Sequence, residues 1–398
     1  MTRPLLTLVA ALLAAPAFAQ APTALPPKDF VEYYSAARVH AGGGDPYDGA
    51  QLMPWQVAMM PPGEHTGVVM LWTPPWTLPL YTPFGWLDPN AAHLAWLATQ
   101  TLLLLLSGLA LAAVYGGGRW WAWLVPVGVL LTSFEVTRLL VYGQNSAVVL
   151  AGLAGFVYFR SRGYPVAAGL VGALTAVKPH LLLPFATLLL FDARTPAGRR
   201  VLLGGVLALA VGSLLAVLPN RAIFADFLRA ITAPTSDTAV AVTDWEVPLL
   251  GFWLRMTIDP QQFRWQFVPA ALACLGYAVV RVRTSTPWDW PARLPLVVLV
   301  SLLAAPYGAW VFDLVLLLLP VTATVFVALN SGRAVTIVAA VALHLLRSAV
   351  AAGIPSLGGG WPMTPIALAG YGVVVAMGGG FVSPTRERGT RADSPWGV

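Results

Sequence analysis

Two carboxylates, Asp29 and Glu32, lie near the start of a charged and aromatic stretch that follows the first apolar segment of the chain. The stretch covers residues 28–48 and reads KDFVEYYSAARVHAGGGDPYD. A positioned carboxylate can accept a proton from a reacting hydroxyl, which is general-base catalysis. Charge gathered beside an apolar segment therefore suggests chemistry at the edge of a membrane.

Further polar side chains lie inside, or at the ends of, later apolar runs. They are Glu135, Arg138, Gln144 and Asn145 in TSFEVTRLLVYGQNS, Lys178 and His180 in ALTAVKPHLLLP, Tyr307 and Asp313 in AAPYGAWVFDLVLLLLP, and Arg347 in ALHLLRSAV. Charges at this depth cost several kcal/mol unless they are paired or hydrated. Pro179 directly follows Lys178, which predicts a break in the helix and a polar pocket there.

Several of these residues also have a purely structural interpretation. Glu135 and Arg138 are three residues apart, so one helical face would bring them together as an ion pair. Lys178 could extend its amine to the membrane surface, and Asp313 could cap a helix. The sequence leaves these alternatives open beside the functional ones.

The glycine-rich run AGGGDPYD predicts a turn after a helix. It is not a phosphate-binding loop, because no Gly-Lys-Ser/Thr follows. Its two acids, Asp45 and Asp48, are weak evidence for a metal site.

The composition indicates a polytopic membrane protein. Of the 398 residues, 58% are hydrophobic and only 10% are charged, whereas a soluble domain has about 25% charged residues. The single cysteine, Cys274, excludes an intrachain disulfide framework and a multi-cysteine metal site. The net charge of +6 is explained below by membrane orientation, so it does not require nucleic-acid binding.

The elements that must position these residues are membrane helices. Recurring apolar runs predict an all-α protein with about twelve transmembrane helices. We expect a first helix at 1–20, further helices at 91–218 and 266–382, and a cytoplasmic tail at 383–398. Two long connections, 21–90 and 219–265, lie between these helices. We expect the connection 21–90 to carry short amphipathic helices that cover the site.

The arginines predict the orientation of the chain. Most of them fall in short loops and tails on the same side as residue 1, which the positive-inside rule assigns to the cytoplasm. Both long connections then face the periplasm or the cell exterior, where most acidic residues also lie. The N-terminus, MTRPLLTLVAALLAAPAFAQ, resembles either a cleaved signal peptide or a first membrane helix, and twelve spans require the uncleaved helix.

Four segments, taken in order, resemble glycosyltransferase family 87 of the GT-C superfamily. They are DFVEYYSAARVHAGGGDPYD, LWTPPWTLPLYTPFGWLDPNAAHLAW, the segment from GQNSAVVL to VKPHLLLP, and APYGAWVFDLVLLLLP. Trp-Thr-Pro-Pro stands where Tyr-Pro-Pro is common in the family, and Ala305 where serine is common. The resemblance covers most of residues 29–320.

The resemblance, for Asp29, and the chemistry of sugar transfer, for the others, suggest roles for the candidate residues. Asp29 would be the catalytic base of an inverting sugar transfer, with Glu32 as its rival. The cations that receive the leaving phosphate would be Lys178, Arg138 and Arg347. The residues that bind substrate would be Gln144, Asn145, His180, Tyr307 and Asp313.

The predicted function is therefore transfer of a monosaccharide, by the resemblance mannose, from a polyprenyl-phosphate donor to a glycan or glycolipid acceptor. The site would lie on the outer face of the cell membrane, with the bilayer as a further partner. We expect no metal, no other cofactor and no nucleic acid. The alternative function is a flippase or transporter of lipid-linked sugars, which would use the same cations without a base.

Overall fold

The computed structural model describes residues 29–59, 67–232, 249–284, 287–353 and 363–378, and this part of the chain is helical without any strand. Its α-helices are α2 (Phe30–Ala41), α3 (Gly49–Val57), α4 (Leu78–Gly85), α5 (Pro89–Tyr115), α6 (Leu124–Thr132), α7 (Phe134–Tyr142), α8 (Ser146–Ser161), α9 (Pro165–Gly172), α10 (Leu183–Asp192), α11 (Pro196–Val217), α12 (Ile223–Thr232), α14 (Leu250–Ile258), α15 (Val268–Arg283), α16 (Trp290–Leu303), α17 (Leu318–Ser331), α18 (Ala334–Gly353) and α19 (Met363–Gly378). Short 3-10 helices are η2 (Pro75–Thr77), η3 (Ala173–Val177), η4 (Pro179–Leu182), η5 (Phe263–Phe267) and η6 (Asp313–Leu317). The predicted first helix at 1–20 and the predicted tail at 383–398 lie outside the described residues.

The helices are those of a polytopic membrane protein, but the predicted number of spans is not confirmed. Four described helices are long and apolar enough to cross a bilayer: Pro89–Tyr115, Pro196–Val217, Phe263–Arg283 and Asp313–Ser331. The helices α6 and α7 would form a fifth span if counted together, although they bend by 67°. The other apolar helical stretches have 10 to 17 residues: Ser146–Ser161, Pro165–Val177, Pro179–Asp192, Trp290–Leu303, Ala334–Val350 and Met363–Met377.

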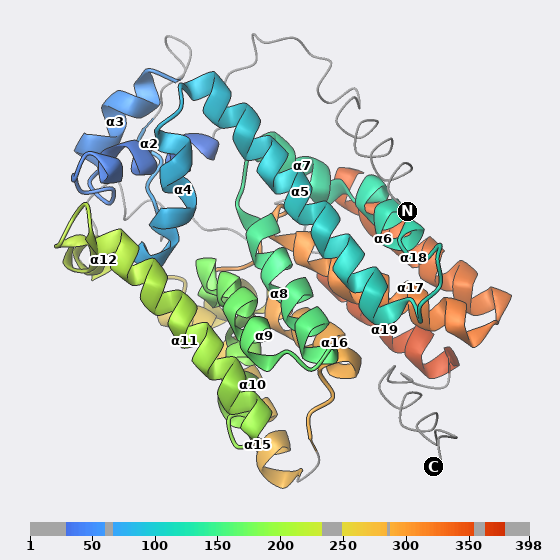
Figure 1. Cartoon of the computed structure of the whole chain (residues 1–398). Coiled ribbons are helices and arrows are strands. Elements are labelled where there is room, and N and C mark those ends of the chain that lie inside the picture. The colour runs from blue at the N-terminus through green and yellow to red at the C-terminus, as the bar shows by residue number, and fades with distance from the viewer. Residues whose placement is uncertain (1–28, 60–66, 233–248, 285–286, 354–362, 379–398) are drawn as a thin grey trace, which may run out of the picture.

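The segment before α5 forms a lobe with its own core. The helices α2, α3 and α4 lie together at one end of the molecule, close to α12 and the start of α5 (Figure 1). Nearly every residue of α2 is buried, so this helix is not the amphipathic one that we predicted. Gly85 of α4 permits the close packing, because a Cβ there would lie 2.9 Å from the backbone of Ala37.

The helix break predicted at Pro179 is confirmed. Lys178 has φ −130° and ψ 72°, outside the helical region, and separates η3 from η4. Proline has no amide hydrogen and its ring restricts the residue before it, which explains the break at this position. A second interruption lies between α16 and η6, and it brings Asp313 to the start of a short helix.

The ion pair predicted between Glu135 and Arg138 is wrong. Glu135 instead lies 2.7 Å from Arg347, which comes from α18. The helices α7 and α18 pack against each other, so a partner distant in sequence replaces the neighbour on the same helix. Arg138 packs over the ring of Phe134 at 5.0 Å.

Candidate active site

The candidate site is organised by the turn between α7 and α8. The helix α7 ends at Gly143, whose φ of 68° is the left-handed conformation that glycine adopts without strain. The carbonyl of Gly143 accepts a hydrogen bond from Trp96 Nε1 at 2.7 Å, and Asn145 Nδ2 donates to the Tyr81 hydroxyl at 2.7 Å. These two bonds tie the turn to α5 and α4, which fixes the direction of Gln144.

Gln144 joins an acid to a cation. Its Nε2 donates a hydrogen bond to Asp29 Oδ2 at 2.9 Å. Its Oε1 accepts from Lys178 Nζ at 2.9 Å and from the Tyr33 hydroxyl at 2.8 Å. An amide has donors on one side and an acceptor on the other, so this single side chain sets the positions of both charged groups.

Lys178 is buried and its amine is fully hydrogen bonded. Besides Gln144, Nζ donates to Asp313 Oδ1 at 2.7 Å and to Ser146 Oγ at 3.1 Å. These three acceptors match the three N–H donors of a lysine ammonium. The alternative in which Lys178 reaches for the membrane surface is therefore wrong, and the amine is held inside the protein.

Asp313 is the counter-ion of Lys178. Its Oδ2 accepts from the backbone amide of Trp310 at 3.2 Å, and its Oδ1 also accepts from the Ser146 hydroxyl. The side chain is 2% exposed. A buried lysine and a buried aspartate of this kind are stable only as a pair, because either charge alone would be costly to bury.

Asp29 and Glu32 lie at the start of α2 in different environments. Asp29 is half-buried and occupies the position before the first residue of the helix, whereas Glu32 is 7% exposed. Burial, and then the neighbouring charge of Asp29, raises the pKa of Glu32 to about 8. The raised pKa favours the protonated form of Glu32, which makes Asp29 the better candidate for a base.

Two aromatic rings, those of Tyr142 and Phe312, connect Arg138 with Lys178. Its guanidinium lies 5.8 Å from the centre of the Tyr142 ring, and the rings of Tyr142 and Phe312 are 5.9 Å apart. Lys178 Nζ lies 5.0 Å from the centre of the Phe312 ring. Both cations thus border the same pair of aromatic rings.

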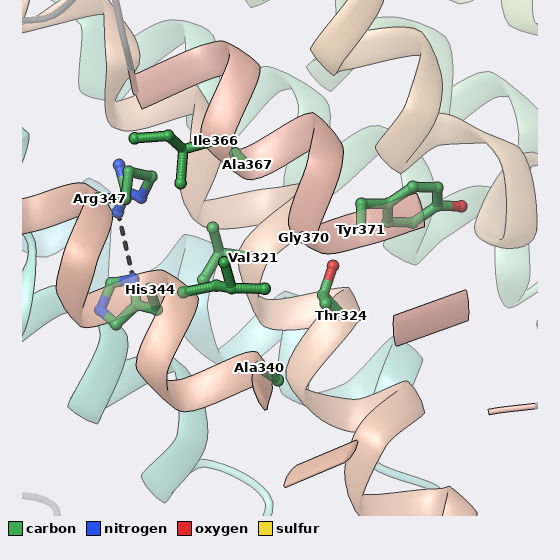
Figure 2. Close-up of a pocket in the computed structure, with 10 residues that line it drawn as sticks. Val321, Thr324, Ala340, His344, Arg347, Ile366, Ala367, Gly370 and Tyr371 are labelled. Carbon is green, nitrogen blue, oxygen red and sulfur yellow. Dashed lines mark hydrogen bonds between the residues drawn. The ribbon is translucent and has the colours of Figure 1, made fainter. Parts of the chain in front are cut away.

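Arg347 belongs to a separate polar group. Besides its ion pair with Glu135, its Nη2 lies 3.2 Å from His344 Nδ1, and Figure 2 shows the two side chains one turn apart on α18 beside Ile366 and Ala367 of α19. Among the described residues no hydrogen bond or ion pair connects this group with Lys178. The neighbouring cavity has a volume of about 20 Å³, which is room for about one water molecule. Phosphate binding by Arg347 stays a prediction, and its placement favours a structural role.

His180 and Tyr307 meet in an aromatic cluster. Their rings are 5.3 Å apart and nearly perpendicular. The Tyr307 ring also contacts Phe263 and Phe267 of η5 at 5.3 and 5.4 Å. The cluster joins the break after Lys178, the break after α16 and the connection before α15.

Two members of the site, Tyr33 and Ser146, were not among the residues predicted from the sequence. Both lie inside segments that drew attention, Tyr33 one position after Glu32 and Ser146 one position after Asn145. A hydroxyl beside candidate acids and amides was the available signal. Neither residue carries charge, so the cost of burying charge did not single them out.

Asp45 and Asp48, the acids that might have held a metal, have other partners. Asp45 accepts from the backbone amide of Tyr47 and pairs with Arg229, and Asp48 caps α3. In the described part of the chain, no group of three or more His, Cys, Asp or Glu residues could hold a metal ion.

With this geometry known, comparison with known proteins identifies the family. The model of glycosyltransferase family 87 matches residues 72–306, which is more than half of the chain. The chain belongs to glycosyltransferase family 87. The comparisons with curated proteins and with solved structures found no match.

The family 87 match covers only part of the candidate site. Gln144, Ser146 and Lys178 lie inside residues 72–306, whereas Asp29 and Asp313 lie outside them. Hydrogen bonds from Gln144 and Lys178 connect these two acids to the matched region. This family 87 chain therefore builds its candidate site from three parts of the sequence.

Proposed function

We propose that this family 87 enzyme transfers a monosaccharide from a polyprenyl-phosphate donor to a glycan or glycolipid acceptor on the outer face of the cell membrane. Mannose is the sugar that the family resemblance favours. The observation that supports the proposal is Asp29, a half-buried carboxylate held by Gln144 at 2.9 Å and linked through the same amide to Lys178. A base and a cation in fixed relation are what an inverting sugar transfer needs.

The proposed reaction is a single displacement at the anomeric carbon. The acceptor oxygen attacks C1 while Asp29 takes the hydroxyl proton, as the carboxylate base does in inverting sugar hydrolysis. The C1–O bond to phosphate breaks, and the polyprenyl phosphate leaves with the electron pair. The products are the glycosylated acceptor, with inverted configuration at C1, and polyprenyl phosphate.

The cations would stabilise the negative charge that develops on the leaving phosphate. Lys178 has three acceptors already, so a phosphate oxygen would displace one of its two neutral partners, Gln144 or Ser146. This exchange is favourable because a charged acceptor binds an ammonium more strongly than a neutral one does. Arg138, across the Tyr142 and Phe312 rings, is the second cation of this proposal.

Glu32 has a supporting role in this mechanism. Its raised pKa favours the protonated form, which adds no second negative charge beside Asp29. A protonated carboxyl is also a hydrogen-bond donor. Asp29, which is more exposed than Glu32, is the carboxylate that an acceptor can reach.

The test is transfer of radiolabelled sugar by membranes that contain the full chain. Polyprenyl-phosphate mannose is offered first and other polyprenyl-phosphate sugars next. The proteins compared are wild type, Asp29→Asn and the control Asp259→Asn, which removes a partly exposed acid from the turn between α14 and η5. Label should enter a new product, with inverted anomeric configuration, for wild type and the control only. Movement of the donor across the bilayer with no product from any donor would contradict the proposal and support a flippase.

A further inference from the structure

A cleft lies on the same lobe as Asp29, outside the hydrogen-bond network of the candidate active site. Its volume is 320 Å³, at the lower end of the range for small-molecule sites. Its lining includes Tyr34, Arg38, Trp55, Met59, Trp86 and Asp88. We call it the aromatic cleft.

The walls of the aromatic cleft are held by contacts within the lobe. Arg38 donates to the carbonyl of Gly85 at 2.8 Å and lies 4.3 Å from the centre of the Trp55 ring. The Tyr34 hydroxyl donates to the carbonyl of Leu87 at 3.0 Å. Trp86 is different, because it is 70% exposed. The cleft therefore combines aromatic and guanidinium groups that have partners in the lobe with an indole that is open to solvent.

The charges of the aromatic cleft favour a neutral ligand with hydroxyl groups. Asp88 caps α5 through Oδ1, which accepts from the backbone amides of Asn90 and Ala91, so its Oδ2 is the acceptor left for a ligand. Arg38 gives one N–H to Gly85 and keeps its other donors. The cleft therefore carries one charge of each sign. An anion such as a lipid phosphate would be attracted by Arg38 and repelled by Asp88. A sugar ring suits both, because its hydroxyls donate and accept while its C–H face packs against an indole.

We propose that the aromatic cleft binds a sugar ring of the acceptor glycan. The inference rests on the proposed function, since it gives the acceptor a second subsite away from the reacting hydroxyl. Tyr33 donates to Gln144 in the candidate active site, whereas the next residue, Tyr34, lines the cleft. Successive helical residues point about 100° apart, so the two sites lie on different sides of α2. The ring in the cleft is not the reacting one, and the acceptor is longer than a monosaccharide.

The test is saturation-transfer NMR on the full chain in lipid nanodiscs, with methyl α-D-mannopyranoside and a linear mannotriose as probes. Wild type and Asp29→Asn should both saturate the ring protons of the probes. Trp86→Ala should lower the signal about fivefold, which is what an aromatic contact is worth. Trp86 is mostly exposed, so its truncation leaves the fold intact. The control Trp120→Ala removes another indole, 79% exposed and far along the chain, and should leave the signal unchanged.

Two results separate this inference from the proposed function. Loss of saturation in Trp86→Ala, without any sugar transfer by wild type, would support the cleft and contradict the transferase. Sugar transfer by wild type, with equal saturation in all four proteins, would overturn the cleft alone. A third result would overturn the cleft as a sugar site in favour of a lipid headgroup. In that case Trp86→Ala would leave the saturation of both sugars unchanged but would weaken the binding of anionic lipid added to the nanodiscs.

Discussion

Asp29 and Lys178 are joined through one amide, because Gln144 donates to Asp29 Oδ2 at 2.9 Å and accepts from Lys178 Nζ at the same distance. The three residues lie in parts of the sequence that are far apart, yet a movement of Gln144 would displace both charges. The turn that carries Gln144 is itself fixed by Trp96 and Tyr81. The position of the proposed base thus depends on residues that do not touch substrate.

Gln144 is predicted to be a positioning residue. Gln144→Met should lower kcat by about 10²-fold, the usual effect of a misplaced reacting group, with a smaller change in the acceptor KM. Gln144→Glu should not restore the rate, because an ionised carboxylate cannot donate to Asp29. Steady-state kinetics on purified protein measure both, with Gln261→Met on an exposed turn as the control. A normal kcat for Gln144→Met would show that the amide is dispensable.

The pair of Lys178 and Asp313 is predicted to show strong coupling in stability. Lys178→Met and Asp313→Asn should each destabilise the protein by about 3–5 kcal/mol, because each leaves a buried group without its partner. The double variant should be less destabilised than the sum of the two, while all three variants lose transfer activity. Thermal unfolding in detergent measures the coupling. Additive losses of stability would contradict the pairing.

Arg347 and Arg138 are predicted to differ in what they contribute. Arg347→Met should lower thermal stability, since it leaves Glu135 buried without its charge partner, but should not change the donor KM of the folded protein. Arg138→Met should raise the donor KM by about 10-fold or more, the worth of a lost charge-assisted contact, with little effect on stability. A raised donor KM for Arg347→Met would contradict the structural role and support phosphate binding by Arg347.

Glu32 is predicted to make stability depend on pH. Its folded pKa is raised above the unfolded value, to about 8, so the folded state binds the proton more tightly. Stability should therefore fall as the pH rises from about 5 to about 8 and level off above that. Glu32→Gln cannot ionise, so its melting temperature relative to wild type should increase over the same range. If the melting temperatures of Glu32→Gln and wild type differed by the same amount at pH 5 and pH 9, the Glu32 pKa would not be raised.

The sequence was informative about which residues form the site because burying charge is costly. Asp29, Lys178 and Asp313 stood out as ionisable groups at the edge of, or within, apolar runs, and Pro179 predicted the break beside Lys178. Their mutual contacts were not predictable, since Gln144 and Asp29 are 115 residues apart and Lys178 and Asp313 are 135 apart. Such pairings depend on how α8 packs between its neighbours.

The wrong pairing of Glu135 with Arg138 and the unconfirmed number of spans also have a physical cause. The rule for residues three apart on a helix paired Glu135 with Arg138, but that rule considers one helix alone. Packing of α18 against α7 offered Glu135 a buried arginine instead. The number of spans was uncertain for a related reason, because breaks at positions such as Lys178 and the bend after α6 divide apolar runs into short helices.

The central claim is that Asp29 is the base of a sugar transfer, and purified Asp29→Asn tests it most directly. Turnover and equilibrium binding of the polyprenyl-phosphate donor are measured on the same preparation beside wild type. The predicted result is a loss of turnover of about 10³-fold or more with donor binding unchanged, because asparagine keeps the shape of the side chain but cannot take the proton. Turnover close to wild type, with the same donor binding, would contradict the claim.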